Sequence, residues 1–371
     1  MQKINHNIYQ QSQPDEAVAL PKKKLFEPSL HAFRGFAILN VVAVHVFSFF
    51  IYYAQTEKPV LDVEFLNRAN EVLFHDATIY FTLISGILFS LVLKQRGWKS
   101  FYRSKLLNVL VPYILMTCLF TWSHYSVDGY KLFDEGLASY FQNVGTNLLI
   151  GDAIFTFWYV PVLFVLYLIT PLLVALTKNK LTSVLLIILS LLPLFFSRVW
   201  PQLSYTTFIY FAGVYTAGIY IGNHFHGIIE KTQQYFWLIA ATGLLSTLVL
   251  WFLYTSDVEK WGVLSFQESV FYIQKLSITG LVLMLFKRFA DKLPKWLDTL
   301  GDYAFPIYFL HAYIICVTYD LLIAWKVNLA NIPQLIILCI ASLLITLGTC
   351  LVVAKLFKIF FGRWSRHFIG A

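Results

Sequence analysis

Long apolar segments recur along the whole chain, and the first of them, residues 30–53, reads LHAFRGFAILNVVAVHVFSFFIYY. A helix needs about 20 predominantly apolar residues to cross the hydrocarbon core of a bilayer. By this measure the sequence predicts ten membrane-spanning helices, at residues 33–53, 72–93, 107–124, 157–177, 181–197, 206–222, 235–254, 269–286, 303–323 and 333–357. Only 13% of the residues are charged, whereas soluble domains carry roughly a quarter. We therefore expect an all-α, polytopic integral membrane protein.

The distribution of Lys and Arg predicts which side of the membrane each loop faces. With ten spans, both termini lie on one side, and that side receives most of the basic residues, including Arg103, Lys105 and the group from Lys287 to Lys295. Because Lys and Arg concentrate in cytoplasmic loops, both termini are expected in the cytoplasm. The same bias accounts for the net charge of +8 without a nucleic-acid partner.

The segments outside the spans are short. Residues 1–29 are mainly polar and contain no apolar core leading to a small-residue cleavage site. We expect them to form a cytoplasmic N-terminal segment rather than a removable signal peptide. A single transmembrane domain then covers residues 30–360, and residues 361–371 form a cytoplasmic tail. The four cysteines lie inside apolar segments without metal-ligand spacing, which predicts packing roles and no metal site.

Ionisable side chains inside the predicted spans are the candidates for function, because each is costly in a bilayer unless it faces a partner, water or the bundle interior. They are Arg34, His45, His75, Asp76, Lys275 and His311. Arg34 begins the first span, and His45 lies eleven residues further on, or roughly 16 Å further across the membrane. Eleven residues return a helix to within about 20° of its starting face. Arg34 at the cytoplasmic surface and His45 just past the middle therefore share one face.

Each of these residues also has a purely structural interpretation. Arg34 can snorkel to the lipid headgroups, and His45 can be a neutral, hydrogen-bonded packing residue. His75, Asp76 and Lys275 are expected to surround an outward-facing cavity near His45; alternatively, Asp76 and Lys275 form an ion pair that locks two helices. His311 lies in the inner half of its span and is expected to face the cytoplasmic side.

Four segments in a fixed order resemble the motifs of a known family. In the first, Arg34 and His45 stand with ten residues between them. The others are FTLISGILFSLVLKQRGWKSFYRSKLLNVLVPYIL (residues 81–115), FWYVPVLFVLYLITPLL (residues 157–173) and GDYAFPIYFLHAYI (residues 301–314). In content, order and spacing they resemble the acyltransferase 3 family of integral membrane O-acyltransferases. The chain departs from the family pattern in two places: Asp302 precedes Tyr303-Ala304 where Ser-Tyr is usual, and the basic cluster after the second span is thinner.

The resemblance implies an enzyme of the bacterial cytoplasmic membrane. It would move an acyl group, commonly acetyl, from cytoplasmic acyl-CoA to a hydroxyl of an extracytoplasmic or lipid-linked glycan, without a metal. Arg34, Arg103 and Lys105 would hold the phosphates of the donor. The thioester arm would run along the first span, and His45 would act as general base on the acceptor hydroxyl.

Further residues are assigned by the same resemblance. The coenzyme channel is expected to include Ser85, Tyr303 and His311. Trp158 and Tyr159 are expected to stack on a sugar ring of the acceptor, with Asp76 and Lys275 nearby. Structural alternatives remain for these residues: Ser85 with Gly86 also suits close helix packing, the two aromatic residues also suit an interfacial belt, and basic loop 94–105 also suits a topology signal.

Three other functions remain open at this point. A succinyl donor would need a cation for its second carboxylate, and Lys275 is the candidate. A transporter or flippase would use the buried charges as a substrate path, and a structural scaffold would have little need of them. Acceptor choice is expected to reside in the outer loops at residues 125–156 and 255–268.

Overall fold

The computed structural model describes residues 27–57, 61–94, 97–123, 132–198, 203–254 and 263–371. Within these ranges the chain is helical apart from short connections, and it contains no strand. The predicted all-α fold is therefore confirmed for the described residues. Most of the expected N-terminal segment lies outside them, as do parts of the two loops expected to choose the acceptor.

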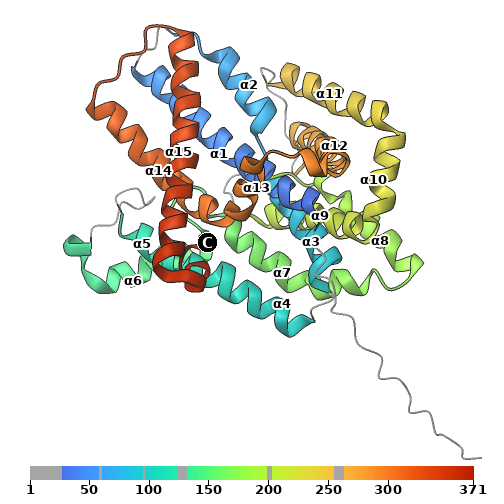
Figure 1. The fold of residues 1–371 in the computed structure, drawn as a ribbon. Helices are drawn as coiled ribbons and strands as arrows, with labels where there is room; N and C mark the ends of the chain where they lie inside the picture. The colour runs from blue at the N-terminus through green and yellow to red at the C-terminus, as the bar shows by residue number, and fades with distance from the viewer. Residues whose placement is uncertain (1–26, 58–60, 95–96, 124–131, 199–202, 255–262) are drawn as a thin grey trace, which may run out of the picture.

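Figure 1 shows the described helices in chain order. They are α1 (Pro28–Glu57), α2 (Glu64–Phe74), α3 (Thr78–Leu88), α4 (Trp98–Lys105), α5 (Val111–Thr121), α6 (Leu132–Ile150), α7 (Tyr159–Ala175), α8 (Lys180–Ser190), α9 (Tyr205–Asn223), α10 (Phe225–Gln234), α11 (Phe236–Leu253), α12 (Phe266–Arg288), α13 (Lys295–Asp302), α14 (Ala304–Ala324), α15 (Ile332–Phe361) and α16 (Ser365–Ile369). Single π-helical segments extend α3 over Phe89–Leu93 and join α4 to α5 over Leu106–Leu110. Short 3-10 turns lie at Leu192–Leu194, Ala290–Lys292 and Gly362–Trp364.

Polar side chains fix the starting points of several helices. The first backbone N–H groups of a helix have no partner within it, and an Asn or Ser side chain can accept a hydrogen bond from one of them. Four helices, α8, α9, α12 and α15, begin in this way, at Asn179, Ser204, Ser265 and Asn331. These caps fix the residue at which each of the four helices begins.

Seven helical segments of the described chain are long and apolar enough to cross a membrane. They are Pro28–Thr56, Glu64–Leu93, Trp98–Thr121, Phe236–Leu253, Phe266–Arg288, Ala304–Ala324 and Ile332–Ile369. The other three predicted spans coincide with the shorter apolar helices Tyr159–Ala175 and Thr182–Leu194 and with α9. The predicted membrane protein is thus supported, while ten crossings with both termini in the cytoplasm stay a prediction.

Helix α1 occupies the middle of the bundle, where it packs against α2, α3, α12, α13, α14 and α15 (Figure 1). Its buried side includes Phe33, Ile38 and Val42, none of which has exposed surface. Because α1 is surrounded by other helices, Arg34 and His45 face neighbouring helices rather than lipid. They are directed into spaces between helices.

The start of α1 is held against α13 by two glycines. A methyl group added at Gly35 would lie 2.2 Å from the carbonyl oxygen of Leu297, and one added at Gly301 would lie 2.5 Å from that of His31. No other residue fits such close backbone contacts. As a result, α13 lies directly on the first turns of α1 and ends at Asp302, which lines the same cavity as Arg34.

Candidate functional site

One face of α1 borders two cavities at different depths. His45, with Val41 and Val44, lines a cavity of about 350 Å³, which we call the His45 cavity. Arg34, eleven residues earlier, lines a cavity of about 1120 Å³, which we call the basic cavity. Both side chains are half-buried. The helical spacing that predicted a shared face thus leads to two separate spaces.

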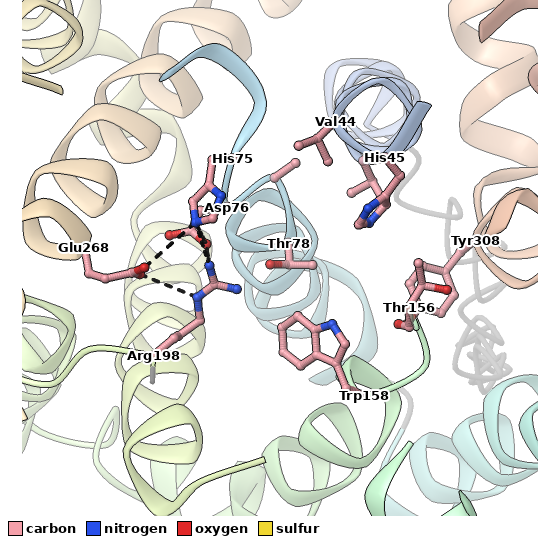
Figure 2. Close-up of a pocket in the computed structure, with 12 residues that line it drawn as sticks. Val44, His45, His75, Asp76, Thr78, Thr156, Trp158, Arg198, Glu268 and Tyr308 are labelled. Atoms are coloured by element: carbon pink, nitrogen blue, oxygen red, sulfur yellow. Dashed lines mark hydrogen bonds and ion pairs between the residues drawn. The ribbon is translucent and has the colours of Figure 1, made fainter. Parts of the chain in front are cut away.

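The His45 cavity is lined from five other parts of the chain (Figure 2). Its remaining lining residues are His75, Asp76, Ala77 and Thr78 between α2 and α3, Thr156 and Trp158 before α7, Arg198 before α9, Glu268 of α12 and Tyr308 of α14. Figure 2 shows the charged residues on the side opposite Tyr308 and Thr156, with the Trp158 ring below the opening between them. Charged groups and a flat aromatic surface therefore face His45 across one small space.

Arg198 is the centre of the charged group. Its guanidinium forms an ion pair with Asp76, lies 3.5 Å from Glu268 between Nε and Oε2, and lies 3.2 Å from Nε2 of His75 between nitrogens. The other ring nitrogen of His75 lies 2.7 Å from Oε2 of Glu71. Asp76 has a backbone φ of +60°, a conformation that Asp tolerates better than most residues. This turn between α2 and α3 directs both His75 and Asp76 toward Arg198.

The same three side chains, His75, Asp76 and Glu268, offer ligand atoms that all lie within 4.8 Å of one another. Such a set suits a divalent cation. Arg198 already contacts all three, however, and its guanidinium occupies the side of the group where a cation would be held.

His311 lies beside His45, with 5.5 Å between the ring centroids, and it has no exposed surface. The sequence placed His311 in the inner half of its span, toward the cytoplasm, but the structure places it beside His45 and outside the lining of both cavities. Membrane helices tilt to different degrees, so counting residues along two separate spans does not give their relative depth. Nδ1 of His311 lies 3.0 Å from the carbonyl oxygen of Ile307 and 2.8 Å from that of Tyr308. If Nδ1 carries the proton, Nε2 is an acceptor, and it is buried without a partner among the described residues.

Of the four residues expected to contact the acceptor, only two line the His45 cavity. Trp158 and Asp76 do. Tyr159 does not, since its hydroxyl pairs with that of Thr82 at 2.7 Å. Lys275 is fully buried outside the lining and donates to the carbonyl oxygen of Leu73 at 2.9 Å. The expected Asp76–Lys275 ion pair is also wrong, because Asp76 pairs with Arg198 instead.

The basic cavity collects most of the residues expected to bind the donor. Arg34, Lys105 and Tyr303 line it together. Arg103 is exposed and lies outside the lining. Ser85 lines neither cavity, and a methyl group on its neighbour Gly86 would lie 2.5 Å from the carbonyl oxygen of Tyr215. That close contact between α3 and α9 supports the packing interpretation of the Ser-Gly pair.

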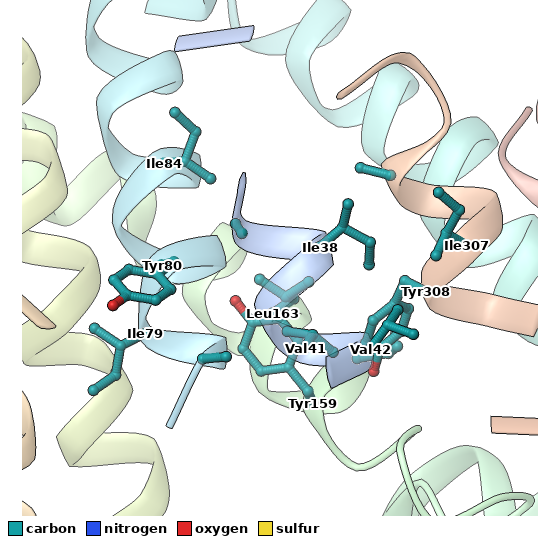
Figure 3. Packing of buried hydrophobic residues seen from close by; sticks show 14 of the residues in the cluster. Ile38, Val41, Val42, Ile79, Tyr80, Ile84, Tyr159, Leu163, Ile307 and Tyr308 are labelled. Atoms are coloured by element: carbon teal, nitrogen blue, oxygen red, sulfur yellow. The ribbon is translucent and has the colours of Figure 1, made fainter. Parts of the chain in front are cut away.

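Buried apolar side chains pack around the part of α1 that lies between Arg34 and His45 (Figure 3). On the face of α1 between Arg34 and His45, Ile38 has no exposed surface. Figure 3 shows Ile38 and Val42 next to Ile307 of α14, with Leu163 of α7 packed nearby. All four belong to one buried cluster. A molecule held in the basic cavity therefore reaches His45 only if these side chains move apart.

Sequence reasoning missed Arg198 and Glu268. Arg198 falls among the loop charges, and Glu268 stands one residue before a predicted span. Neither position carries a local signal, because their juxtaposition with His75 and Asp76 is produced by the packing of α9 and α12 on α3. The periodicity argument reaches only residues of one helix.

Comparison with known proteins gives one match. A family model described as an acyltransferase domain matches residues 27–351. Searches of curated proteins and of solved structures returned no match. The matched range includes every residue of the His45 cavity, together with Arg34, Lys105 and Tyr303 of the basic cavity.

Proposed function

Because the chain belongs to the acyltransferase 3 family, we propose that it transfers an acyl group, in the simplest case acetyl, from acyl-CoA to a hydroxyl of an extracytoplasmic or lipid-linked glycan. One observation carries the proposal: a single helix face borders a large basic cavity at Arg34 and a small cavity with a histidine at its wall. The donor phosphates need the basic cavity, and the reacting hydroxyl of the acceptor needs the histidine. In this proposal the basic cavity opens to the cytoplasm of a bacterium and the His45 cavity to the opposite side.

The donor is held in the basic cavity. Arg34 and Lys105 make charge-assisted hydrogen bonds to its phosphates, which arginine in particular forms with two parallel N–H groups. The acylated arm of the coenzyme then passes the layer at Ile38 to reach His45, a distance of roughly 16 Å along α1. Since that layer is closed, the arm enters by displacing the apolar side chains, and water is kept out until it does.

At His45 the reaction is an ester exchange. The imidazole takes the proton of the acceptor hydroxyl, the oxygen attacks the thioester carbonyl carbon, the carbon–sulfur bond breaks, and the proton passes to the leaving sulfur. The products are the acylated glycan and the free thiol of the coenzyme. Direct transfer is the proposal; a covalent acyl-histidine would use the same side chain as nucleophile.

The wall opposite Tyr308 suits a sugar. Asp76 and Glu268 offer carboxylate oxygens that accept hydrogen bonds from hydroxyl groups, and Arg198 offers donors. The Trp158 ring provides a flat apolar surface, with the Arg198 guanidinium 5.8 Å from its centroid. We therefore assign acceptor binding to this wall.

The competing functions find less support. A succinyl donor called for Lys275 near the reacting carbonyl, but Lys275 lies outside the cavity lining. A flippase would not require a coenzyme A site. Binding of coenzyme A to the detergent-solubilised protein separates the classes, and transfer of label from radiolabelled acetyl-CoA to glycan in membranes tests the proposal itself. Lack of binding to the folded protein would refute it.

Arg34→Ala is expected to weaken coenzyme A binding roughly 10- to 100-fold, because it removes a hydrogen-bonding charge of about 1.5–3 kcal/mol from the basic cavity. Titration calorimetry on the purified protein measures the change. Lys99→Ala is the matched control, since Lys99 is basic and exposed on α4 but lines neither cavity. Equal affinities for the wild type and Arg34→Ala would mean that Arg34 serves only the fold.

His311→Ala is expected to slow acyl transfer roughly 10- to 100-fold without changing the affinity for coenzyme A. The reason is its position beside His45 and outside the lining of the basic cavity. Parallel measurements of transfer rate and coenzyme binding separate this role from direct coenzyme binding. If the affinity fell and the rate at saturating donor did not, His311 would belong to the coenzyme channel after all.

A further inference from the structure

The last residues of the chain form one wall of the basic cavity. Helix α15 ends at Phe361, and Gly362, with a φ of +52°, turns the chain back toward the bundle. Ser365 and Ile369 of α16 are buried. His367 lies 3.0 Å from the carbonyl oxygen of Leu107 through Nδ1. The expected cytoplasmic tail, residues 361–371, is thus a docked segment with fixed contacts.

This segment and the end of α15 bring a second set of cations to the cavity. Lys358, Arg363 and Arg366 all line it, together with Arg34 of α1 and Lys105 of α4. Asp302 is the one side-chain carboxylate in the lining of the described chain. Five basic side chains against one acidic side chain are more than a single diphosphate needs, and they come from three separate parts of the chain.

An aromatic side chain accompanies the second set. Trp364 lines the cavity, its side chain is 59% exposed, and its ring centroid lies 5.5 Å from that of His367. An exposed indole beside cations is suited to stacking on a flat heteroaromatic base. The cavity, at about 1120 Å³, lies above the range of about 300–1000 Å³ typical of small-ligand sites, so it has room for a ligand with several separate parts.

We propose that Lys358, Arg363, Trp364 and Arg366 form a subsite for the phosphorylated adenosine end of coenzyme A, with the arginines on the 3′-phosphate and Trp364 on the adenine. The inference rests on the proposed function and divides the donor between two walls. Arg34 and Lys105 hold the diphosphate next to the path to His45. The docked segment binds the adenosine end of the coenzyme. The 3′-phosphate there is a monoester that carries close to two negative charges, and it suits the bidentate geometry of arginine.

The test compares coenzyme A with dephospho-coenzyme A, which lacks only the 3′-phosphate. The wild-type protein in detergent is expected to bind coenzyme A roughly 10- to 100-fold more tightly than dephospho-coenzyme A. The double variant Arg363→Gln/Arg366→Gln is expected to bind both ligands with the weaker affinity. Its unchanged affinity for dephospho-coenzyme A shows that the cavity is still folded.

Lys355→Gln serves as the control, because Lys355 is also an exposed cation on α15 but does not line the cavity. It should keep the full discrimination. Equal wild-type affinities for the two ligands would overturn the inference and leave the proposed function intact. Absence of binding by either ligand would instead refute the proposed function. If the double variant lost affinity for coenzyme A and dephospho-coenzyme A equally, the docked segment would shape the cavity without binding the 3′-phosphate.

Discussion

The His45→Ala variant is expected to transfer acyl groups roughly 10²- to 10⁴-fold more slowly than the wild type, with its affinity for coenzyme A unchanged. The size of the loss is that of a missing general base. Binding is preserved because His45 lines a separate cavity from Arg34, with the buried Ile38 layer between them. The rate is measured as label moved from radiolabelled acetyl-CoA to glycan in membranes that contain the variant.

Two further variants make this result specific. His45→Gln keeps a hydrogen-bonding side chain of similar length but cannot accept a proton at neutral pH, so it should be as slow as His45→Ala. His224→Ala, at an exposed histidine that lines neither cavity, should transfer at the wild-type rate. Wild-type activity in His45→Gln would mean that the ring only fills space beside Phe155, which it contacts at 5.2 Å between centroids.

The sequence was sufficient for features that depend on one helix at a time. Apolar length identified the helices, and the period of 3.6 residues identified the common face of Arg34 and His45. Both arguments use only local geometry: seven described helical segments are long and apolar enough to cross a membrane, and Arg34 and His45 both line cavities. Gly35 follows Arg34 directly, and its close contact with the carbonyl oxygen of Leu297 explains why no larger residue fits there.

Features that depend on several helices escaped prediction for a physical reason. Arg198 and Glu268 reach the His45 cavity, and His311 lies beside His45, only because α9, α12 and α14 pack where they do, and relative depth depends on helix tilt. Lys275 was expected near the cavity on the same kind of estimate, yet its ammonium group is satisfied by a backbone carbonyl of α2. An ionisable residue inside a span signals a buried partner without saying which one.

The docked end of the chain is a similar case. Residues 365–369 are too few to show a helical period, and their burial depends on two side chains, Ser365 and Ile369, that fit against α5 and α14. Charge counting treated the basic residues there as a topology signal. A topology signal and a phosphate-binding site would both place basic residues at these positions. Only the location of the residues around the basic cavity distinguishes the two interpretations.

Loss of Arg198 should be among the most destabilising single changes in this protein. Asp76 has a fully buried side chain and Glu268 a nearly buried one, and both carboxylates face the guanidinium. Removing one partner of a buried pair typically costs about 3–5 kcal/mol, because a charge is left without compensation. Arg198→Gln is therefore expected to lower the thermal unfolding midpoint by many degrees, measured by differential scanning fluorimetry in detergent.

The double variant Arg198→Gln/Asp76→Asn tests whether charge is the cause. It removes one of the two carboxylates that lose their partner, so part of the lost stability should return, as it does when both members of a buried pair are replaced. Arg288→Gln is the matched single control, at a cation on the last turn of α12 that forms no ion pair in the described chain.

If the double variant were less stable than Arg198→Gln alone, Asp76 would stabilise its turn through other contacts, and Arg198 would act through its packing on Trp158 and Phe211. Recovery of stability without recovery of acyl transfer would separate the two roles of this group, because the same oxygens that hold Arg198 are those assigned to the hydroxyls of the acceptor.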